Sequence, residues 1–403
     1  MKFDRFCCNV NTRFHRRFVL LIALMTLGIV GSITLRADTG NCGGASITLP
    51  FTDVPSNSIF FCSIAEAYFS ALTNGTSSTT YSPAANVTRE QMSAFVTRTL
   101  DQSLQRGSRR AVLHQFWTTQ GANNLALTGG MNDPLLVKCD GVDLWVANFG
   151  NDTVSRVRAS DGRLLETWTG ATGAIGVLTA MGKVFITGNA GTGKLYQIDP
   201  TQAPGAVSIL SSSVGSDPHA IAYDGLKIWT ANSGGSVSII NVNPISVSSV
   251  VMGFSTPVGM LYDGSNIWVT DPGDNKLKQL DANGAILQSV TLGSSPYYPA
   301  FDGTNIWVPN IGSNTVSVVR ASTAVVIATL SGNGLNGPYQ AAFDGERILV
   351  TNNTGSSVSL WRATDLTPIG TFSVGSSVGP YGVCSDGLNF WISLANTNQL
   401  ARF

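Results

Sequence analysis

The sequence predicts an all-β protein, a seven-bladed β-propeller, with a small α-helical N-terminal module and a signal peptide in front of it. Charged residues make up only 12% of the chain and Gly occurs 43 times, a composition typical of many short strands joined by glycine-bearing turns. A unit of strands and turns also recurs about every forty residues, which is the period of propeller blades. In residues 301–323 an apolar run around Trp307, an Asn-x-Gly turn at Asn310–Gly312 and alternating valines predict strand, turn and strand.

The first 37 residues predict a secretory signal. Arg13, Arg16 and Arg17 precede an apolar run at 18–30, and small residues follow it. These are the parts of such a signal. The run is short for crossing a bilayer, and an uncleaved anchor is the alternative. In either case we expect the rest of the chain to be extracytoplasmic, either secreted or associated with the cell surface.

The charge balance argues against a nucleic-acid partner. The formal net charge is zero, but residues 1–37 hold six of the 24 basic residues and one of the 24 acidic ones. The remaining 18 basic and 23 acidic residues make the exported part mildly acidic. Nucleic-acid-binding domains carry a basic surface instead, so we expect no nucleic-acid partner. Separately, we expect the protein to be a monomer.

Four cysteines follow the signal: Cys42, Cys62, Cys139 and Cys384. In an oxidising compartment a Cys42–Cys62 disulfide can staple a small module. Cys139 and Cys384 lie in the first and last repeat units, which ring closure makes neighbours, and we expect them to be buried free thiols. No CxxC pair and no His/Cys spacing indicates a metal site, and we expect no cofactor.

Residues 38–110 predict the small helical module. Apolar residues at helical spacing predict a helix over 63–72. They also predict a second helix, whose apolar face comprises Met92, Phe95, Val96 and Leu100. Thr88 followed by Gln91 is a capping-box pattern at the start of this second helix.

Three elements of the module resemble one S-layer homology motif: Phe51–Pro55, Tyr81–Pro83 and Val87–Gln91. Domains of that family anchor proteins to cell-wall polysaccharide. The resemblance implies that Arg89 contacts the anionic glycan, with Asp53 and Thr88 supporting it. The alternative is that these three residues only cap and orient the helices.

The repeat array occupies residues 111–403. Six units share a proline six residues before an Asp-Gly pair: Pro134/Asp140, Pro218/Asp224, Pro257/Asp263, Pro296/Asp302, Pro338/Asp344 and Pro380/Asp386. A large apolar residue lies five after each Asp: Trp145, Trp229, Trp268, Trp307, Leu349 and Trp391. A seventh unit, marked by Met181-Gly182 and Phe185, fills the double-length gap after Asp140. Seven units therefore predict seven blades, since a four-stranded sheet must stack on neighbours to bury both faces.

Closure of the ring is predicted from the two ends of the array. The last unit stops at Phe403, before its outer strand, while residues 112–128 precede the first complete unit. We expect 112–128 to supply the missing strand, because closure removes exposed sheet edges.

The repeats resemble the YVTN/NHL group of seven-bladed propellers, which includes the streptogramin lyases; Asp263–Thr270 is an example. The resemblance implies the fold more than the activity, since such propellers include binding scaffolds, lactonase-like hydrolases and streptogramin lyases.

The array is poor in residues for catalysis. Beyond the signal the only histidines are His114 and His219, and the only glutamates of the array are Glu166 and Glu346. A streptogramin-type lyase needs a His and a Glu on neighbouring blades, and a lactonase-type site needs Glu, Asn and Asp converging on one metal ion. Neither Glu starts an inner strand. We therefore assign no catalytic residue, and we expect a protein that is not an enzyme.

Residues that follow the repeat prolines are expected to rim one end of the central channel. Among them His219, Tyr297, Tyr339 and Tyr381 are candidates for binding a glycan or a peptide. The alternative is that the tyrosines only pack between blades. The polar residues of the nearby turns are expected to satisfy their own turn backbones: Asn148, Asn232, Asp271, Asn310 and Asn352.

Together these features predict an exported binding or interaction scaffold at the cell surface, with cell-wall polysaccharide as one partner and a protein or glycan at the propeller face as another. An extracytoplasmic hydrolase or lyase that uses the propeller channel is the alternative function.

Overall fold

The computed structural model describes residues 38–42, 45–69, 72–107, 126–250 and 253–403. The predicted signal and residues 112–125 lie outside these ranges. The chain divides into two compact units, with the boundary between Arg106 and Gly107. Within the described ranges, no helix has the length and apolar character needed to cross a membrane.

The smaller unit combines two helices with a β-hairpin that the sequence did not predict. The hairpin pairs β1 (Asp38–Cys42) with β2 (Ala45–Leu49), and the helices are α2 (Phe61–Phe69) and α3 (Arg89–Gly107). Its core comprises Leu49, Phe51, Val54, Phe61, Ile64 and Ala65. Alternating Ile47 and Leu49 send one face of β2 into this core, which explains the extra strand. The sulfurs of Cys42 and Cys62 are bonded, with their Cα atoms 5.5 Å apart.

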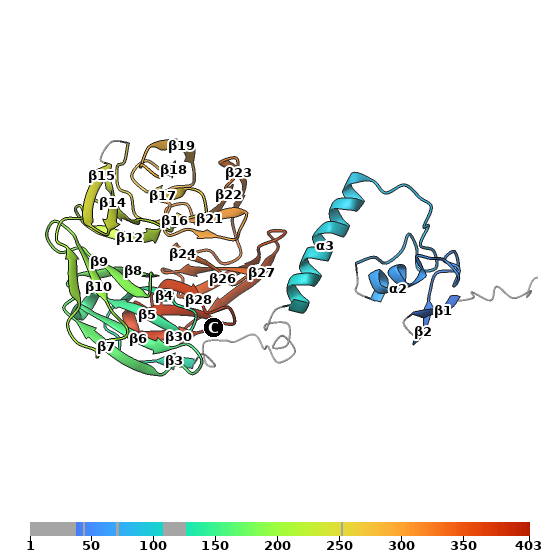
Figure 1. The fold of residues 1–403 in the computed structure, drawn as a ribbon, viewed down its shortest axis with the longest axis horizontal. Helices are drawn as coiled ribbons and strands as arrows, with labels where there is room; N and C mark the ends of the chain where they lie inside the picture. Colours follow the sequence, from blue (N-terminus) through green and yellow to red (C-terminus); the bar gives the residue numbers. More distant parts are fainter. Residues whose placement is uncertain (1–37, 43–44, 70–71, 108–125, 251–252) are drawn as a thin grey trace, which may run out of the picture. The chain divides into compact units, whose positions relative to one another are not determined.

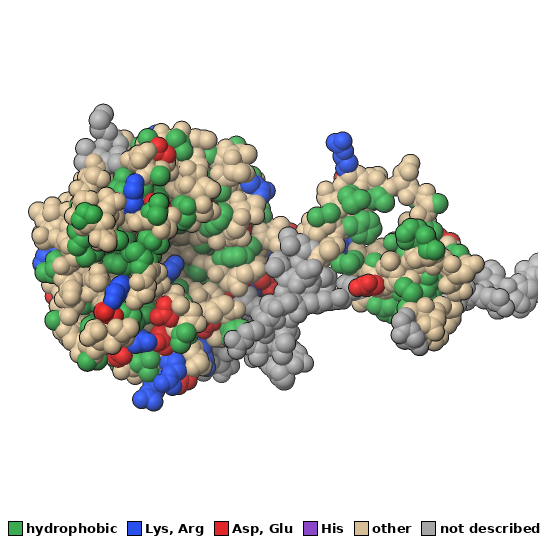
Figure 2. Space-filling view, viewed as in Figure 1, with side chains coloured by type: hydrophobic (Ala, Val, Ile, Leu, Met, Phe, Trp, Pro, Cys, Tyr) green, Lys and Arg blue, Asp and Glu red, His purple; other side chains and the backbone are tan. Residues whose placement is uncertain are grey.

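Helix α3 exposes part of its apolar face. Met92 and Val96, both on the predicted apolar face of this helix, are 52% and 61% exposed. Phe60 and Phe69 of the same unit are each 62% exposed. Figure 2 shows such apolar side chains on the surface of the smaller unit.

The larger unit is a propeller of seven four-stranded sheets, as predicted. Figure 1 shows the first strands of the sheets around one centre and the fourth strands at the outside. The inner strands are β4 (Pro134–Cys139), β8 (Ala174–Ala180), β12 (Pro218–Tyr223), β16 (Met260–Tyr262), β20 (Ala300–Phe301), β24 (Pro338–Phe343) and β28 (Pro380–Ser385). The second strands are β5 (Asp143–Asn148), β9 (Lys183–Gly188), β13 (Ile228–Asn232), β17 (Ile267–Asp271), β21 (Asn305–Asn310), β25 (Arg347–Asn352) and β29 (Phe390–Leu394).

The outer half of each blade is equally regular, and all the pairings are antiparallel. The third strands are β6 (Thr153–Arg158), β10 (Lys194–Ile198), β14 (Ser236–Val242), β18 (Lys276–Leu280), β22 (Thr315–Arg320), β26 (Ser357–Arg362) and β30 (Gln399–Arg402). The fourth strands are β7 (Leu164–Thr169), β11 (Ser208–Ser211), β15 (Ile245–Val250), β19 (Ile286–Thr291), β23 (Val325–Leu330), β27 (Pro368–Ser373) and β3 (Ala126–Thr128). Short 3-10 turns, η3 (Phe149–Asn151) and η4 (Ala395–Thr397), follow β5 and β29.

The ring closes through a strand from the beginning of the array. β3 pairs with β30, so that the last blade has the order β28-β29-β30-β3. The predicted closing strand is therefore confirmed for residues 126–128. Beside it, Ser393 Oγ donates to the Leu135 carbonyl across the first and last blades at 2.5 Å. The first and last blades are thereby joined and the ring is closed.

The repeated Asp does more than form a turn. In five blades its carboxylate accepts the indole N–H of the Trp five residues later, at 2.7–2.9 Å: Asp140–Trp145, Asp224–Trp229, Asp263–Trp268, Asp302–Trp307 and Asp386–Trp391. In the sixth, where Leu349 replaces Trp, Arg347 Nε donates to Asp344 at 3.0 Å. In the blade of Met181 and Phe185 both partners are replaced. The Asp and Trp occur together because a buried indole N–H requires an acceptor.

Candidate functional site

The four predicted rim residues converge at one end of the channel. Tyr297 precedes β20, Tyr339 is on β24, Tyr381 is on β28 and His219 is on β12. The ring centroids of Tyr339 and Tyr381 are 4.1 Å apart, and those of Tyr297 and Tyr339 are 4.7 Å apart. The tyrosines therefore form one aromatic cluster across three blades.

A fourth tyrosine, Tyr298, lies within this cluster and was missed from the sequence. It is 3% exposed, and its hydroxyl lies 3.0 Å from Nδ1 of His219. The Tyr339 hydroxyl donates to that of Tyr381. Its signal in the sequence was the run of two tyrosines between Pro296 and Pro299, whose rings both lie against Tyr339.

His219 also has a carboxylate beside it. Its Nε2 lies 3.4 Å from Oδ2 of Asp217. Burial lowers the pKa of His219, while the nearby charge of Asp217 acts in the opposite direction. Burial also raises the pKa values of Tyr298, Tyr339 and Tyr381, so these phenols stay protonated at neutral pH. The cluster therefore offers neutral rings and hydroxyls, with one His–Asp pair.

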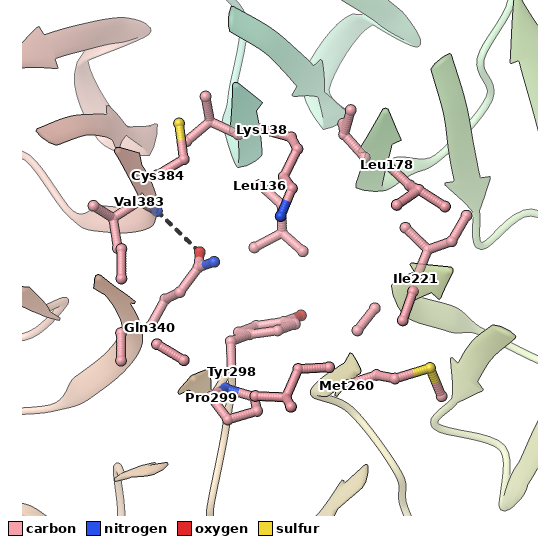
Figure 3. Close-up of a pocket in the computed structure, with 18 of the residues that line it drawn as sticks. Leu136, Lys138, Leu178, Ile221, Met260, Tyr298, Pro299, Gln340, Val383 and Cys384 are labelled. Atoms are coloured by element: carbon pink, nitrogen blue, oxygen red, sulfur yellow. Dashed lines mark hydrogen bonds between the residues drawn. The ribbon is translucent and has the colours of Figure 1, made fainter. Parts of the chain in front are cut away.

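A pocket of about 510 Å³ occupies the channel beyond this cluster. All seven blades contribute lining residues, on or next to their inner strands. The lining residues lie within 136–139, 177–178, 220–223, 260–262, 298–301, 340–343 and 383–385. Figure 3 shows Tyr298 at one wall and Lys138 and Gln340 extending toward the middle. Neither Lys138 nor Gln340 was predicted from the sequence as a site residue. Figure 2 shows apolar side chains around a hollow near the middle of this propeller face.

Cys139 and Cys384 also line this pocket. They are free thiols on β4 and β28, with Cys384 buried and Cys139 half-buried. Burial raises the pKa of both thiols.

The two glutamates of the array lie away from the channel pocket. Glu166 on β7 accepts from Arg156 at 3.2 Å and from the Trp168 indole at 3.2 Å. Glu346 lies in the turn after Asp344, to which its N–H donates. Among the described residues, no three His, Cys, Asp or Glu side chains form a group that could hold a metal ion.

The predicted wall-binding residues of the smaller unit lie in two structural motifs. The Asp53 carboxylate accepts the backbone N–H groups of Tyr81 and Ser82 at 2.8 and 2.7 Å. Burial acts to raise the pKa of this carboxyl, but the backbone hydrogen bonds outweigh it and the pKa is lowered. Thr88 and Gln91 form the predicted capping box, with reciprocal hydrogen bonds of 3.0 and 3.2 Å.

Arg89 is the exposed first residue of α3. Asp53 and Thr88 thus have structural roles, whereas Arg89 forms no ion pair with any residue that the structure describes. A cation at a helix N-terminus faces the positive end of the helix dipole, which is unfavourable. The position of Arg89 is therefore not explained by the stability of α3.

The comparisons with known proteins agree with both units. Residues 50–93 match the family model of the S-layer homology domain. A search of curated proteins finds no match. A streptogramin B lyase structure is similar at 14% identity and a TM-score of 0.59, covering 70% of this chain and 99% of that one. Virginiamycin B lyase from Staphylococcus aureus is similar at 16% identity and a TM-score of 0.59, covering 69% and 98%.

The fold likeness extends to propellers of other kinds. The WD40 propeller domain of Doa1 is similar at 12% identity and a TM-score of 0.60, covering 71% of this chain and 97% of that one. At such identities the likeness concerns the fold alone. The chain thus joins a segment similar to the S-layer homology domain to a seven-bladed propeller with the fold of the streptogramin B lyases.

Proposed function

We propose that the protein is an exported binding scaffold held at the cell surface, with the segment 50–93 attaching to cell-wall polysaccharide. The observation that carries this is the match of 50–93 to the S-layer homology domain. Arg89, which is exposed and forms no ion pair with a described residue, supports it, because a guanidinium on a fixed helix end can bind an anionic glycan through two hydrogen bonds.

Sedimentation of the intact protein with purified cell-wall polysaccharide tests this attachment. Arg89→Gln should weaken binding by about tenfold or more, the effect of losing one charge-assisted hydrogen-bonded contact. Arg98→Gln removes the same charge from the same helix and is the matched control, since Arg98 is engaged with the Leu72 carbonyl at 3.1 Å. Equal binding by both variants and the unmodified protein would contradict the role of Arg89.

For the propeller we propose a second binding site, for a glycan or protein, at the cluster of His219, Tyr297, Tyr339 and Tyr381. Tyr297 and Tyr381 are only partly buried, and exposed aromatic faces stack on sugar rings or side chains. A glycan array probed with the intact protein would find such a ligand. Tyr297→Ala should lose the binding signal, whereas Tyr262→Ala, on another inner strand, should keep it. If both variants keep the signal, this cluster is ruled out as the binding site.

An extracytoplasmic hydrolase or lyase on the same scaffold is the second candidate. The contact between His219 and Asp217 favours it, because a histidine oriented by a carboxylate can act as a general base. Turnover of a lactone or of a cyclic depsipeptide by the intact protein, lost in His219→Gln, would support this activity. Equal turnover by His219→Gln would exclude His219 as its base.

A further inference from the structure

The channel pocket has an unusual combination of lining groups. Most of the side chains that line it are apolar, including Leu178, Ile221 and Met260 (Figure 3). No Asp or Glu is among the described residues that line it. Lys138 is its one cationic side chain within the described residues. A volume of about 510 Å³ is within the range of small-ligand sites.

Lys138 breaks the repeat pattern at its position. It lies four residues after Pro134, and the equivalent residues of the other blades are uncharged: Leu178, Ala222, Leu261, Ala300, Ala342 and Cys384. The side chain is exposed and forms no ion pair with a described residue. The Asp140 and Asp386 carboxylates of the adjoining turns accept indole N–H groups instead. The propeller fold therefore does not require a charge here.

Gln340 breaks the pattern at a second position, and its amide orientation is determined. Its Oε1 accepts the backbone N–H of Val383 at 2.9 Å. A backbone N–H can only donate, so the amide oxygen must face Val383 and the Nε2 group must face away from it. Figure 3 shows this hydrogen bond and the amide nitrogen on the channel side of it. Nε2 has no acceptor among the described residues.

Lys138 and Gln340 thus present only donors to a pocket that has no carboxylate among its described lining residues. One positive charge and a neutral N–H donor match a monoanion with two acceptor oxygens, and the apolar wall matches a hydrocarbon body. A phosphate dianion would leave charge and acceptors unmatched in such a pocket, because burying an unpaired charge is costly.

We propose that the channel pocket binds an amphipathic monocarboxylate, whose carboxylate lies at Lys138 and Gln340 and whose hydrocarbon part lies against the wall formed by Leu178, Ile221 and Met260. This site lies in the channel beyond the tyrosine cluster and is independent of wall binding.

Calorimetric titration of the intact protein tests the proposal with decanoate and 1-naphthoate as probes, and with decanol as the uncharged counterpart of decanoate. At least one carboxylate should bind with a Kd below about 1 mM. Decanol should bind about 10- to 100-fold more weakly than decanoate, the effect of losing a charge-assisted contact. Absence of binding by both carboxylates, or equal binding of decanoate and decanol, would overturn the proposal.

Two variants locate the site. Lys138→Met replaces the charged side chain with an unbranched apolar one that is one atom shorter, and should weaken binding of the carboxylate about 10- to 100-fold. Gln340→Glu keeps an acceptor for Val383 but replaces the N–H donors with negative charge, and should abolish carboxylate binding. Unchanged affinity in either variant, with a thermal melt like that of the unmodified protein, would overturn the assignment.

Two controls separate this site from others. Lys194→Met, which removes a lysine of β10 outside the pocket, should bind the carboxylate as the unmodified protein does. Arg89→Gln should also leave carboxylate binding unchanged, so that failure of wall binding and failure of the channel site are distinguishable. A loss of affinity in Lys194→Met as large as in Lys138→Met would point to nonspecific charge attraction and overturn the site.

Discussion

The blade of β17 and β18 and the blade of β21 and β22 place different chemistry on the same backbone. In the latter, Asn310 is fully buried and donates to the hydroxyls of Thr315 and Ser317 at 3.0 and 2.9 Å. In the former, Asp271 replaces the Asn and Lys278 replaces the Ser. Their charged groups lie 2.5 Å apart, with Asp271 0% and Lys278 2% exposed.

The Lys278 side chain of the charged pair donates to the backbone carbonyl position that the serine of a neutral pair contacts. Ser359, the equivalent of Ser317 in another blade, donates to the carbonyl of Asn333 in the preceding loop at 2.7 Å. Lys278 donates in the same way to the carbonyl of Gly253 at 2.6 Å. Asp271 also accepts two backbone N–H groups, from Ser255 and Thr256. One repeat position can therefore hold a neutral or a charged pair, provided that both partners change together.

Removing one member of the charged pair should have the largest effect. Lys278→Met leaves Asp271 buried without its cation, and should lower the free energy of unfolding by about 3–5 kcal/mol. Urea denaturation measures this. The double variant Asp271→Asn/Lys278→Ser, which installs the neutral pair of the other blade, should recover most of the loss. A double variant as unstable as Lys278→Met would show that the two blades are not interchangeable.

An intermediate effect is expected for the Asp–Trp pair that most blades share. Trp307→Phe removes the indole N–H that donates to Asp302 at 2.7 Å. The free energy of unfolding should fall by about 1–3 kcal/mol, because a half-buried carboxylate oxygen loses a donor. Phe185→Leu is the matched control in the blade without the Asp, where only apolar contacts change. A smaller loss for Trp307→Phe than for the control would contradict the role of the indole hydrogen bond.

The smallest effect is expected from acid. Burial acts to raise the pKa of Asp140, but hydrogen bonds from the Asp143 backbone and the Trp145 indole outweigh it, and the pKa is lowered. A lowered native pKa means that the stabilisation is complete above the ordinary value of 3.8 and is lost as the pH falls through the native pKa. In Asp140→Asn, the melting temperature should therefore fall less steeply as the pH is lowered below about 4. The same loss of melting temperature with falling pH in the variant and the unmodified protein would show that Asp140 does not contribute to this pH dependence.

Contacts within one blade could be predicted from the sequence more readily than contacts between side chains of different strands or blades. The number of blades followed from the recurrence of Pro, Asp-Gly and Trp, because these residues act through turns and hairpins within one unit. The capping box of Thr88 and Gln91 was predictable for the same reason, since its partners are three residues apart. The role of the turn asparagines was not, because residues such as Asn310 donate to hydroxyls on the next strand and not to their own turn.

By itself, then, the sequence determined the elements whose partners are close along the chain, which are the seven units and their turns. The closing strand was also predictable, although β3 pairs with β30 at the other end of the array, because the last unit ends before its outer strand. Only the tertiary structure decided which side chains from different blades meet, such as Tyr298 with His219, or Gln340 with Val383. Those partners are separated by tens of residues, and their contacts depend on the stacking of complete sheets around the channel. Lys138 gained significance only once seven inner strands placed it in a pocket whose described lining residues include no carboxylate.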